Sequence, residues 1–227
     1  MKKRKAFTIQ LPHQPKKEIE WAQKLCSQWG WEHQIVEIDE RHLINSYLLL
    51  AKHLDEPNGD RSLLPTHLLA QIISPYTRVA IGGDGGDELF CGYSRYHQFG
   101  SLLKKHKNAN WGNIYWSHAL KVGDLKAIEQ VNQIMSCSTD TTQTNLPKIL
   151  QSQWSHEPIN FLRILDINYY LPIVLDKVDK TSMFYGLEVR SPLLDTKVAM
   201  AALSITPSRH TTEGKPKAVL KEILRKP

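Results

Sequence analysis

The sequence predicts an α/β protein in which a parallel sheet flanked by helices is followed by a mainly helical C-terminal half. Two short β-type runs occupy residues 6–11 and 31–39, and the segment between them, 16–29, repeats its apolar residues at helical spacing. This β-α-β order is typical of parallel strands joined by a crossover helix. Beyond residue 96 the helical spacing continues with almost no sign of a strand, as in residues 160–184.

Further elements follow from local signals. Two more helices are expected over Arg41–Leu54 and from Pro65 to about Ser74, and Thr77–Gly83 is expected to form another strand. The polar run Ser136–Asn145 is expected to be a loop. Proline favours the first turn of a helix, so helix starts are predicted at Pro158, Pro172, Pro192 and Pro216.

Composition narrows the class of protein. The chain has 227 residues, of which 41% are hydrophobic, enough for a sizeable core. The net charge of +6 permits phosphate ligands, but the basic clusters Lys2–Lys5 and Lys104–Lys107 lack interleaved aromatic residues, so no nucleic-acid partner is expected. Three widely spaced cysteines suit a reducing, cytoplasmic location. No apolar run is long enough to predict a membrane helix.

The segment Gly82–Phe90, GGDGGDELF, supports two incompatible interpretations. It matches the calcium-binding nonapeptide of parallel β-helices, and it also has the composition of a glycine-rich turn that leads from a strand into a helix. The nonapeptide works only in tandem copies, whereas this chain holds one, with a helical pattern after it. The turn is therefore the favoured interpretation.

A glycine-rich turn of this kind can bind an anion and a cation together. Glycines let backbone N–H groups approach a phosphate closely, and the start of the following helix favours negative charge. The carboxylates of Asp84, Asp87 and Glu88 crowd the same turn, where a hydrated Mg²⁺ bridging a nucleotide phosphate would offset their repulsion. Helix capping by Asp84 or Asp87 is the alternative. Asp60 and Ser62 could likewise be ordinary turn residues.

Four stretches of the chain resemble, in the same order, motifs of the asparagine synthetase family in its ATP-using synthetase domain. DEPNGDRSLLP is similar to the family's DEP-x-G-D-x-S-x-x-P segment, and GGDGGDELFCGY is similar to SGDGGDELFGGY. KVDKTSMFYGLEVRSPLLD resembles KVDRASM…LEVRVPFLD, and GKPKAVLKEIL resembles GK-x-K-x-x-LRE. The resemblance runs from about residue 5 to the end of the chain.

This resemblance implies an adenine nucleotide alpha hydrolase-like fold and an ATP-dependent ligase that activates aspartate as β-aspartyl-AMP for attack by ammonia. ATP and Mg²⁺ are the implied cofactors. Aspartate, or a related carboxylate acceptor such as a sugar acid, and ammonia are the implied partners. Residues 1–97 would form a partial α/β nucleotide-binding region, and residues 98–227 the mainly helical remainder of the same domain.

The motif positions assign roles to individual residues. Asp87 is implied as a Mg²⁺ ligand, with Glu88 as a second metal-binding carboxylate. Asp84 takes the family's acidic position near the incoming amine, where it could hold or deprotonate ammonia. Lys217 is implied as the lysine that faces the phosphate and carbonyl oxygens, with Lys215 as the fallback. The expected cofactor-binding residues are Gly82, Gly83, Gly85, Gly86, Asp60 and Ser62. The charges that alternate along Asp176–Lys180 are expected to pair with neighbours or face water.

The chain also departs from the family pattern. Lys2 stands where family members carry the glutaminase cysteine, and the S-G-G-x-D-S pyrophosphate loop expected before Ala6 is not found. Gly82 replaces a serine, and Cys91 replaces a glycine and adds bulk. The chain is therefore expected to be an inner piece of a larger synthetase, either inactive alone or a partner subunit completed by another chain. An uncovered sheet flank is expected to lower its stability or to favour a dimer.

Overall fold

The computed structural model describes the chain except for residues 1–3, 12–15, 57, 97–157, 212–215 and 226–227. Its contacts divide the chain into two compact units. The first comprises residues 1–82 and 172–192, and the second comprises residues 83–171 and 193–227. Residues 172–192 thus group with the N-terminal residues by long-range contacts that no local pattern reports. The division of one synthetase domain into regions 1–97 and 98–227 stays a prediction.

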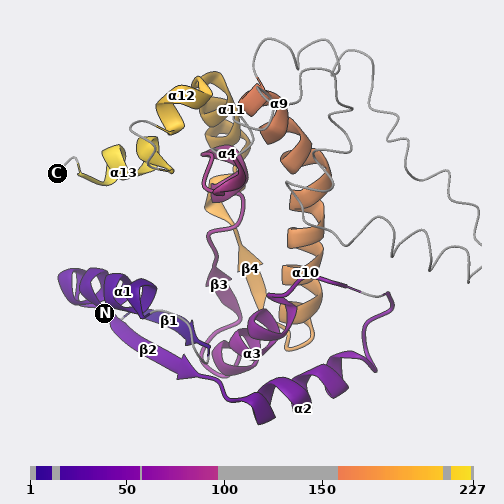
Figure 1. Ribbon diagram of the computed structural model, residues 1–227. Coiled ribbons are helices and arrows are strands. Elements are labelled where there is room, and N and C mark those ends of the chain that lie inside the picture. Colours follow the sequence, from indigo (N-terminus) through magenta and orange to yellow (C-terminus); the bar gives the residue numbers. More distant parts are fainter. Residues whose placement is uncertain (1–3, 12–15, 57, 97–157, 212–215, 226–227) are drawn as a thin grey trace, which may run out of the picture. The chain divides into compact units, whose positions relative to one another are not determined.

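The first unit begins with the β-α-β segment that the apolar spacing predicts (Figure 1). Strand β1 spans Lys5–Gln10, helix α1 spans Lys17–Trp29, and strand β2 spans Glu32–Glu37. The two strands pair in parallel along their whole length. Gly30 ends α1 in the left-handed region, with φ of 64°, a conformation that glycine adopts without a steric penalty. The chain can therefore reverse directly into β2.

Helices α2 and α3 follow close to their predicted positions. Helix α2 spans Glu40–Leu50, and its N-cap Asp39 accepts a hydrogen bond from the backbone N–H of His42 at 2.8 Å. Helix α3 spans Leu63–Ile73. The predicted end of α2 at Leu54 is too late, since the chain leaves the helix in a turn after Leu50.

The core of the first unit lies between α3 and the strands. Helix α3 is hydrophobic over most of its surface, and it therefore packs on β1 and carries apolar residues toward both pairs of strands. One cluster consists of Val36, Ile38 and Leu68, packed with Ile9, Leu11, Leu43 and Ile72. A second consists of Ala70, Ile73 and Leu187, packed with Phe7, Leu69, Ala80, Tyr185 and Val189.

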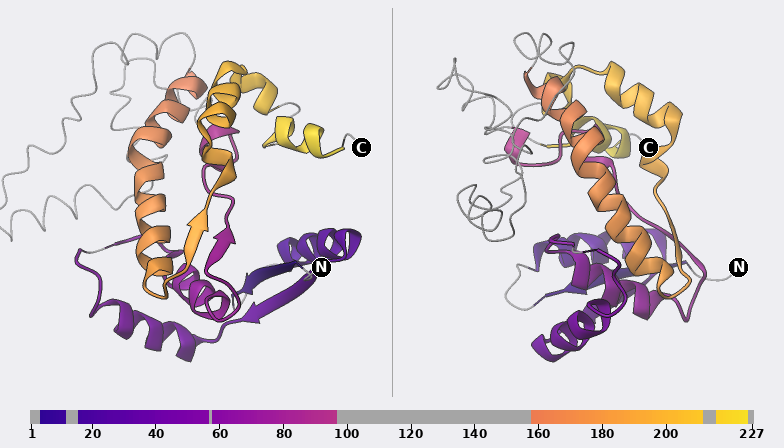
Figure 2. Two further views of the ribbon diagram at one scale, coloured as in Figure 1. Left: turned by 180° about the vertical axis from the view of Figure 1, so that it is seen from behind. Right: turned by 90° about the vertical axis from the view of Figure 1, so that its right-hand side faces the viewer.

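The second pair of strands joins distant parts of the sequence. Strand β3 spans Val79–Ile81 and pairs in parallel with β4, Glu188–Arg190, and Figure 2 shows the two side by side. Helix α10, Leu171–Met183, leads into β4. The sequence showed almost no strand signal here, because β4 has one apolar residue between two charged ones, whereas the three residues of β3 are all apolar. Within the described residues the strands form two two-stranded sheets, so the α/β class and parallel pairing are confirmed, but one continuous sheet is not seen.

The second unit is helical in the residues that the structure describes. Its elements are α4 Gly86–Leu89, α9 Pro158–Leu165, the π-helical turn η3 Asp166–Tyr170, α11 Thr196–Ser204, α12 Pro207–His210 and α13 Ala218–Arg225. A 3₁₀ turn, η4, spans Pro192–Leu194. Helix α4 lies against α11, with Leu89, Phe90 and Ala202 in their shared core. The expected loop at residues 136–145 lies outside the described residues.

The predicted helix starts agree with the structure where it describes them. Pro158 begins α9, Pro172 is the second residue of α10, and Pro192 begins η4. Pro216 lies two residues before α13. Among the described helices, none is both long enough and apolar enough to cross a membrane.

Candidate functional site

The glycine-rich turn forms as a strand-to-helix connection. Gly85 adopts φ of 82°, and the N–H of Gly86 donates to the carbonyl of Gly83 at 3.2 Å as α4 begins. Residues 86–89 are helical, so the extended conformation that a β-helix calcium nonapeptide requires is absent from this segment. The calcium interpretation is therefore wrong.

The four glycines of this turn differ in what they do. The N–H of Gly82 donates to the carbonyl of Arg190 at 2.9 Å, which extends the strand ladder. A Cβ on Gly85 would overlap the Leu194 side chain, and one on Gly86 would lie 2.9 Å from Leu193 Cδ1. A Cβ on Gly83 would meet open space. The positive φ and the close Leu194 side chain thus account for the glycine at 85, and phosphate binding by the four glycines stays a prediction.

Asp87 and Lys217, which the motifs assign to metal and phosphate, meet in the second unit. Lys217 Nζ lies 2.9 Å from Asp87 Oδ1, and the two side chains are 33% and 35% exposed. Both groups are therefore reachable by a ligand while they pair with each other. Lys215 lies outside the described residues.

The backbone around this pair is strained at two places. Lys217 has φ of 56° and Cys91 has φ of 53°, the non-glycine residues with positive φ among those described. Such conformations are costly for residues with a Cβ and gather at functional sites. The sequence showed only that Cys91 replaces a glycine; the structure adds that glycine suits the conformation. Burial raises the pKa of the Cys91 thiol to about 11, so the thiol stays protonated and unreactive.

Gly92 is a site residue that the sequence analysis did not single out. A Cβ at this position would overlap Asp87 Oδ1 and Lys217 Cε. Its N–H donates to the carbonyl of Asp87 at 2.8 Å. The Asp87–Lys217 pair thus lies directly on the backbone of Gly92. The glycine doublet in the family's motif SGDGGDELFGGY is the sequence signal that could have singled out Gly92.

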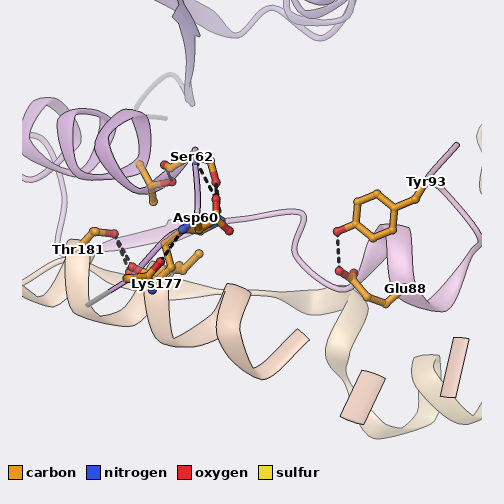
Figure 3. A network of polar contacts seen from close by, with 9 residues as sticks. Asp60, Ser62, Glu88, Tyr93, Lys177 and Thr181 are labelled. Atoms are coloured by element: carbon orange, nitrogen blue, oxygen red, sulfur yellow. Dashed lines mark hydrogen bonds and ion pairs between the residues drawn. The ribbon is translucent and has the colours of Figure 1, made fainter. Parts of the chain in front are cut away.

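Glu88 points toward Tyr93, as Figure 3 shows. Its carboxylate accepts a hydrogen bond from Tyr93 Oη at 2.6 Å, and the residue is 2% exposed. Burial raises the pKa of Glu88 above its usual 4.5, while the Tyr93 hydrogen bond acts in the opposite direction. A metal ligand must be ionised and reachable, so this geometry fits metal binding by Glu88 poorly.

Asp84 lies in the turn before α4 and is half-buried. Its role toward the incoming amine stays a prediction. Within the described residues, no three His, Cys, Asp or Glu side chains gather closely enough to hold a metal ion by themselves. Mg²⁺ is usually held by one or two carboxylates together with substrate phosphates and waters, so the partly exposed carboxylate of Asp87 suits it chemically.

Helix α4 is tied to the second unit by a buried guanidinium. Arg163 is 0% exposed, and its Nη2 donates to the carbonyls of Leu89 at 2.7 Å and Ala202 at 2.9 Å. These carbonyls lie at the C-terminal ends of α4 and α11, where a cation is favourable. Arg163 therefore helps to hold the short helix that carries Asp87.

Asp60 and Ser62 form a polar network with Lys177 in the first unit (Figure 3). Asp60 Oδ1 accepts from Ser62 N at 2.7 Å and from Ser62 Oγ at 2.6 Å. Lys177 Nζ donates to Ser62 Oγ at 2.6 Å and to Asp60 Oδ2 at 3.2 Å. Burial opposes ionisation of Asp60, but the bonds from Ser62 and the Lys177 charge hold its pKa below the usual value.

This network joins the start of α3 to α10. Lys177 is buried, whereas the alternating charges around it predicted side chains that mostly pair with neighbours or face water. The turn interpretation of Asp60 is thus supported, since Asp60 holds the backbone of Ser62 just before α3. Nucleotide binding by Asp60 and Ser62 stays a prediction.

Comparison with known proteins places this α/β chain in a class. The family model described as asparagine synthase matches residues 1–227. Asparagine synthetase [glutamine-hydrolyzing] 1 of Bacillus subtilis is 26% identical over 250 aligned residues, covering 96% of this chain and 39% of the relative. A putative asparagine synthetase of Mycobacterium bovis is 25% identical with 96% and 38% coverage. One from Methanocaldococcus jannaschii is 40% identical over 57 residues, 25% of this chain and 10% of the relative.

The chain therefore belongs to the asparagine synthase family, as its motifs indicated. It spans about 39% of the length of the Bacillus relative.

Proposed function

We propose that this chain is the ATP-using part of an asparagine synthetase-like amide ligase with an adenine nucleotide alpha hydrolase-like fold. The observation that supports it most is the Asp87–Lys217 ion pair at 2.9 Å. Motif position alone assigned Asp87 to a metal and Lys217 to phosphate. Folding brings these two residues together from distant parts of the sequence. The family match over residues 1–227 supports the same assignment.

In the proposed reaction, a carboxylate oxygen of aspartate attacks the α-phosphorus of ATP, and pyrophosphate leaves with the electrons of the broken P–O bond. Ammonia then attacks the carbonyl carbon of the β-aspartyl adenylate. AMP leaves with the electrons of the C–O bond, and the nitrogen loses a proton. The products are asparagine, AMP and pyrophosphate. Such chemistry depends mainly on positioning and charge neutralisation.

The residues of the second unit can supply these effects. Lys217 would place its ammonium against the phosphate oxygens as charge develops on them. Asp84 would hold ammonia or accept its proton. Asp87 would hold Mg²⁺, which when bound neutralises phosphate charge and polarises the P–O bonds. Glu88 is left out of this role because its carboxyl is buried against Tyr93.

Two other functions are distinguished from this one by experiment. The acceptor could be another carboxylate, which pyrophosphate release assayed with aspartate and with sugar acids would distinguish. The chain could also be an inactive piece or a partner subunit with weak nucleotide binding. Mixing it with a chain that carries the S-G-G-x-D-S loop would then restore activity.

The first experiment is isothermal titration of ATP with Mg²⁺ into the purified chain and into the Asp87→Ala variant. We expect binding that requires Mg²⁺ and weakens at least 10-fold in the variant, because the metal-binding carboxylate is lost. Glu20→Ala, on the exposed surface of α1, is the control and should bind as the wild type does.

Circular dichroism spectra of the three proteins must agree before the titrations are compared. Absence of binding in a folded wild-type sample would contradict independent nucleotide binding and favour the inactive piece. Equal binding by the wild type and Asp87→Ala would place the nucleotide elsewhere.

A further inference from the structure

The ion pair of Asp87 and Lys217 raises a conflict within the proposed site. Lys217 Nζ lies 2.9 Å from Asp87 Oδ1. The carboxylate that is proposed to hold Mg²⁺ is therefore already paired with the ammonium group of a lysine. A magnesium ion would approach its ligand oxygen to about 2.1 Å. Two cations at such distances from one carboxylate repel each other strongly. The metal and the ammonium therefore compete for the Asp87 carboxylate.

We propose that Lys217 is a resident counter-ion of Asp87 that competes with the divalent cation and leaves Asp87 when a nucleotide phosphate arrives. This inference rests on the proposed function and adds the order in which Lys217, the metal and the nucleotide bind at Asp87. Without a nucleotide, the lysine weakens metal binding at Asp87. With a nucleotide, the released ammonium gains a phosphate partner, so the same lysine strengthens binding of the metal–nucleotide complex.

The local structure is built to hold this pair. Gly92 leaves space for Asp87 Oδ1 and Lys217 Cε that any other residue would fill. Lys217 adopts the left-handed conformation directly before α13, and its carbonyl accepts from Lys221 N at 3.1 Å. Its backbone is thus held by the helix, and the ammonium moves by rotation of the side chain alone.

The lysine also has a second position within reach. Lys217 Nζ lies 3.8 Å from the place where a Cβ on Gly86 would stand. Because Gly86 begins α4, an ammonium that leaves Asp87 can turn along the bare backbone of the glycine-rich turn. That turn is where the proposed function expects the phosphates.

The first test measures metal binding without nucleotide. Mn²⁺ is titrated into the ¹⁵N-labelled chain, and the dissociation constant is obtained from paramagnetic broadening of the amide signals of residues 83–90. Lys217→Met should bind Mn²⁺ about 2- to 5-fold more tightly than the wild type, the range for loss of a partly exposed ion pair. Lys217→Arg keeps a cation that can pair with Asp87 and should resemble the wild type.

A matched control separates pairing from overall charge. Lys221→Met removes the same charge from an exposed position one turn along α13 and should leave the Mn²⁺ dissociation constant unchanged. An equal gain in Lys221→Met and Lys217→Met would overturn the proposal, since charge alone would then explain it.

The second test asks whether Lys217→Met changes the affinity for MgATP in the opposite direction to the affinity for the bare metal. In isothermal titrations with MgATP, Lys217→Met should bind at least 3-fold more weakly than the wild type, although it binds the bare metal more tightly. A lysine that merely supported the fold would change both affinities in the same direction. That result would overturn the competition.

The Mn²⁺ titration also distinguishes failure of the proposed metal role of Asp87 from failure of the competition alone. If neither the wild type nor Lys217→Met broadens at residues 83–90, Asp87 is not a metal ligand, and both the proposed metal role and this inference are wrong. If both proteins bind Mn²⁺ with equal affinity and Asp87→Asn abolishes binding, the metal role stands and only the competition is wrong.

Discussion

At the scale of single residues, Glu88 shows how burial separates two adjacent acids. Asp87 is about a third exposed on the side chain and pairs with a lysine, whereas Glu88 is 2% exposed and accepts a bond from Tyr93. The first residues of a short helix point in different directions, so the Asp87 carboxylate is partly exposed and the Glu88 carboxylate faces the interior. Burial raises the pKa of Glu88, and hence ionising it in the folded protein costs free energy.

The Glu88→Gln variant should therefore change how stability depends on pH. A folded pKa above the unfolded value means that the contribution of Glu88 is greatest below the unfolded pKa and is lost as pH rises through the folded pKa. Starting near the usual value of 4.5, the wild type should lose stability relative to the variant as pH increases. Urea unfolding at pH 4.5, 5.5, 6.5 and 7.5 measures this difference.

Glutamine keeps an oxygen that can accept the Tyr93 hydrogen bond, so the variant isolates the charge. Glu18→Gln, at an exposed position on α1, provides the background for removing a surface carboxylate. Parallel stability curves for the wild type and Glu88→Gln across this range would contradict the expectation.

At the scale of elements, the network of Asp60, Ser62 and Lys177 joins the start of α3 to α10. Both charged side chains are largely buried, 8% exposed for Lys177 and 13% for Asp60. Removing one member of such a pair leaves the other charge with its desolvation cost and without its partner. The start of α3 therefore depends on a residue of a helix far along the chain.

Lys177→Met should lower the free energy of unfolding by about 2 kcal/mol, the range for a hydrogen bond to a charged group. Urea unfolding followed by circular dichroism measures the change. The double variant Lys177→Met with Asp60→Asn should lose less than the sum of the two single changes, because the residues share one interaction.

Lys180→Met is the matched control, one turn further along α10. Lys180 pairs with Asp55 and Glu56, but those carboxylates are 80% and 66% exposed. Its loss should cost less than about 1 kcal/mol because exposed ion pairs contribute little. Equal losses at Lys177 and Lys180 would contradict the buried network.

At the scale of the whole molecule, the chain exposes apolar surface that a parallel sheet normally covers. Val79 and Ile81 lie on the same face of β3 and are 40% and 79% exposed. Strands of parallel sheets are usually buried on both faces. Trp21 and Trp29 of α1 are also more than half exposed. Exposed apolar side chains of this size favour association.

The purified chain should therefore associate with rising concentration, and Ile81→Thr should weaken that association several-fold. Threonine keeps the β-branched shape of isoleucine while reducing the apolar surface. Sedimentation velocity from about 1 to 100 μM measures the distribution of species. Met200→Thr, at a 64% exposed site on α11, tests whether any exposed apolar residue has the same effect. A monomer at every concentration would contradict the expectation.

Local patterns determined much of this protein. Apolar spacing placed β1, α1, β2 and β3 within a few residues, and prolines marked the starts of α9 and α10, because these signals act over one or two turns of chain. Motif order also identified the family and singled out Asp87 and Lys217 from among many charged residues.

Only the tertiary structure decided which groups meet. It paired β3 with β4, buried Lys177 beside Asp60, turned Glu88 toward Tyr93, and laid the Asp87–Lys217 pair on Gly92. None of these contacts follows from spacing, because a local pattern determines which face of a helix or strand a residue occupies and not which distant segment packs against that face. Exposure and charge pairing depend on that packing, and so the chemistry of the site depends on it as well.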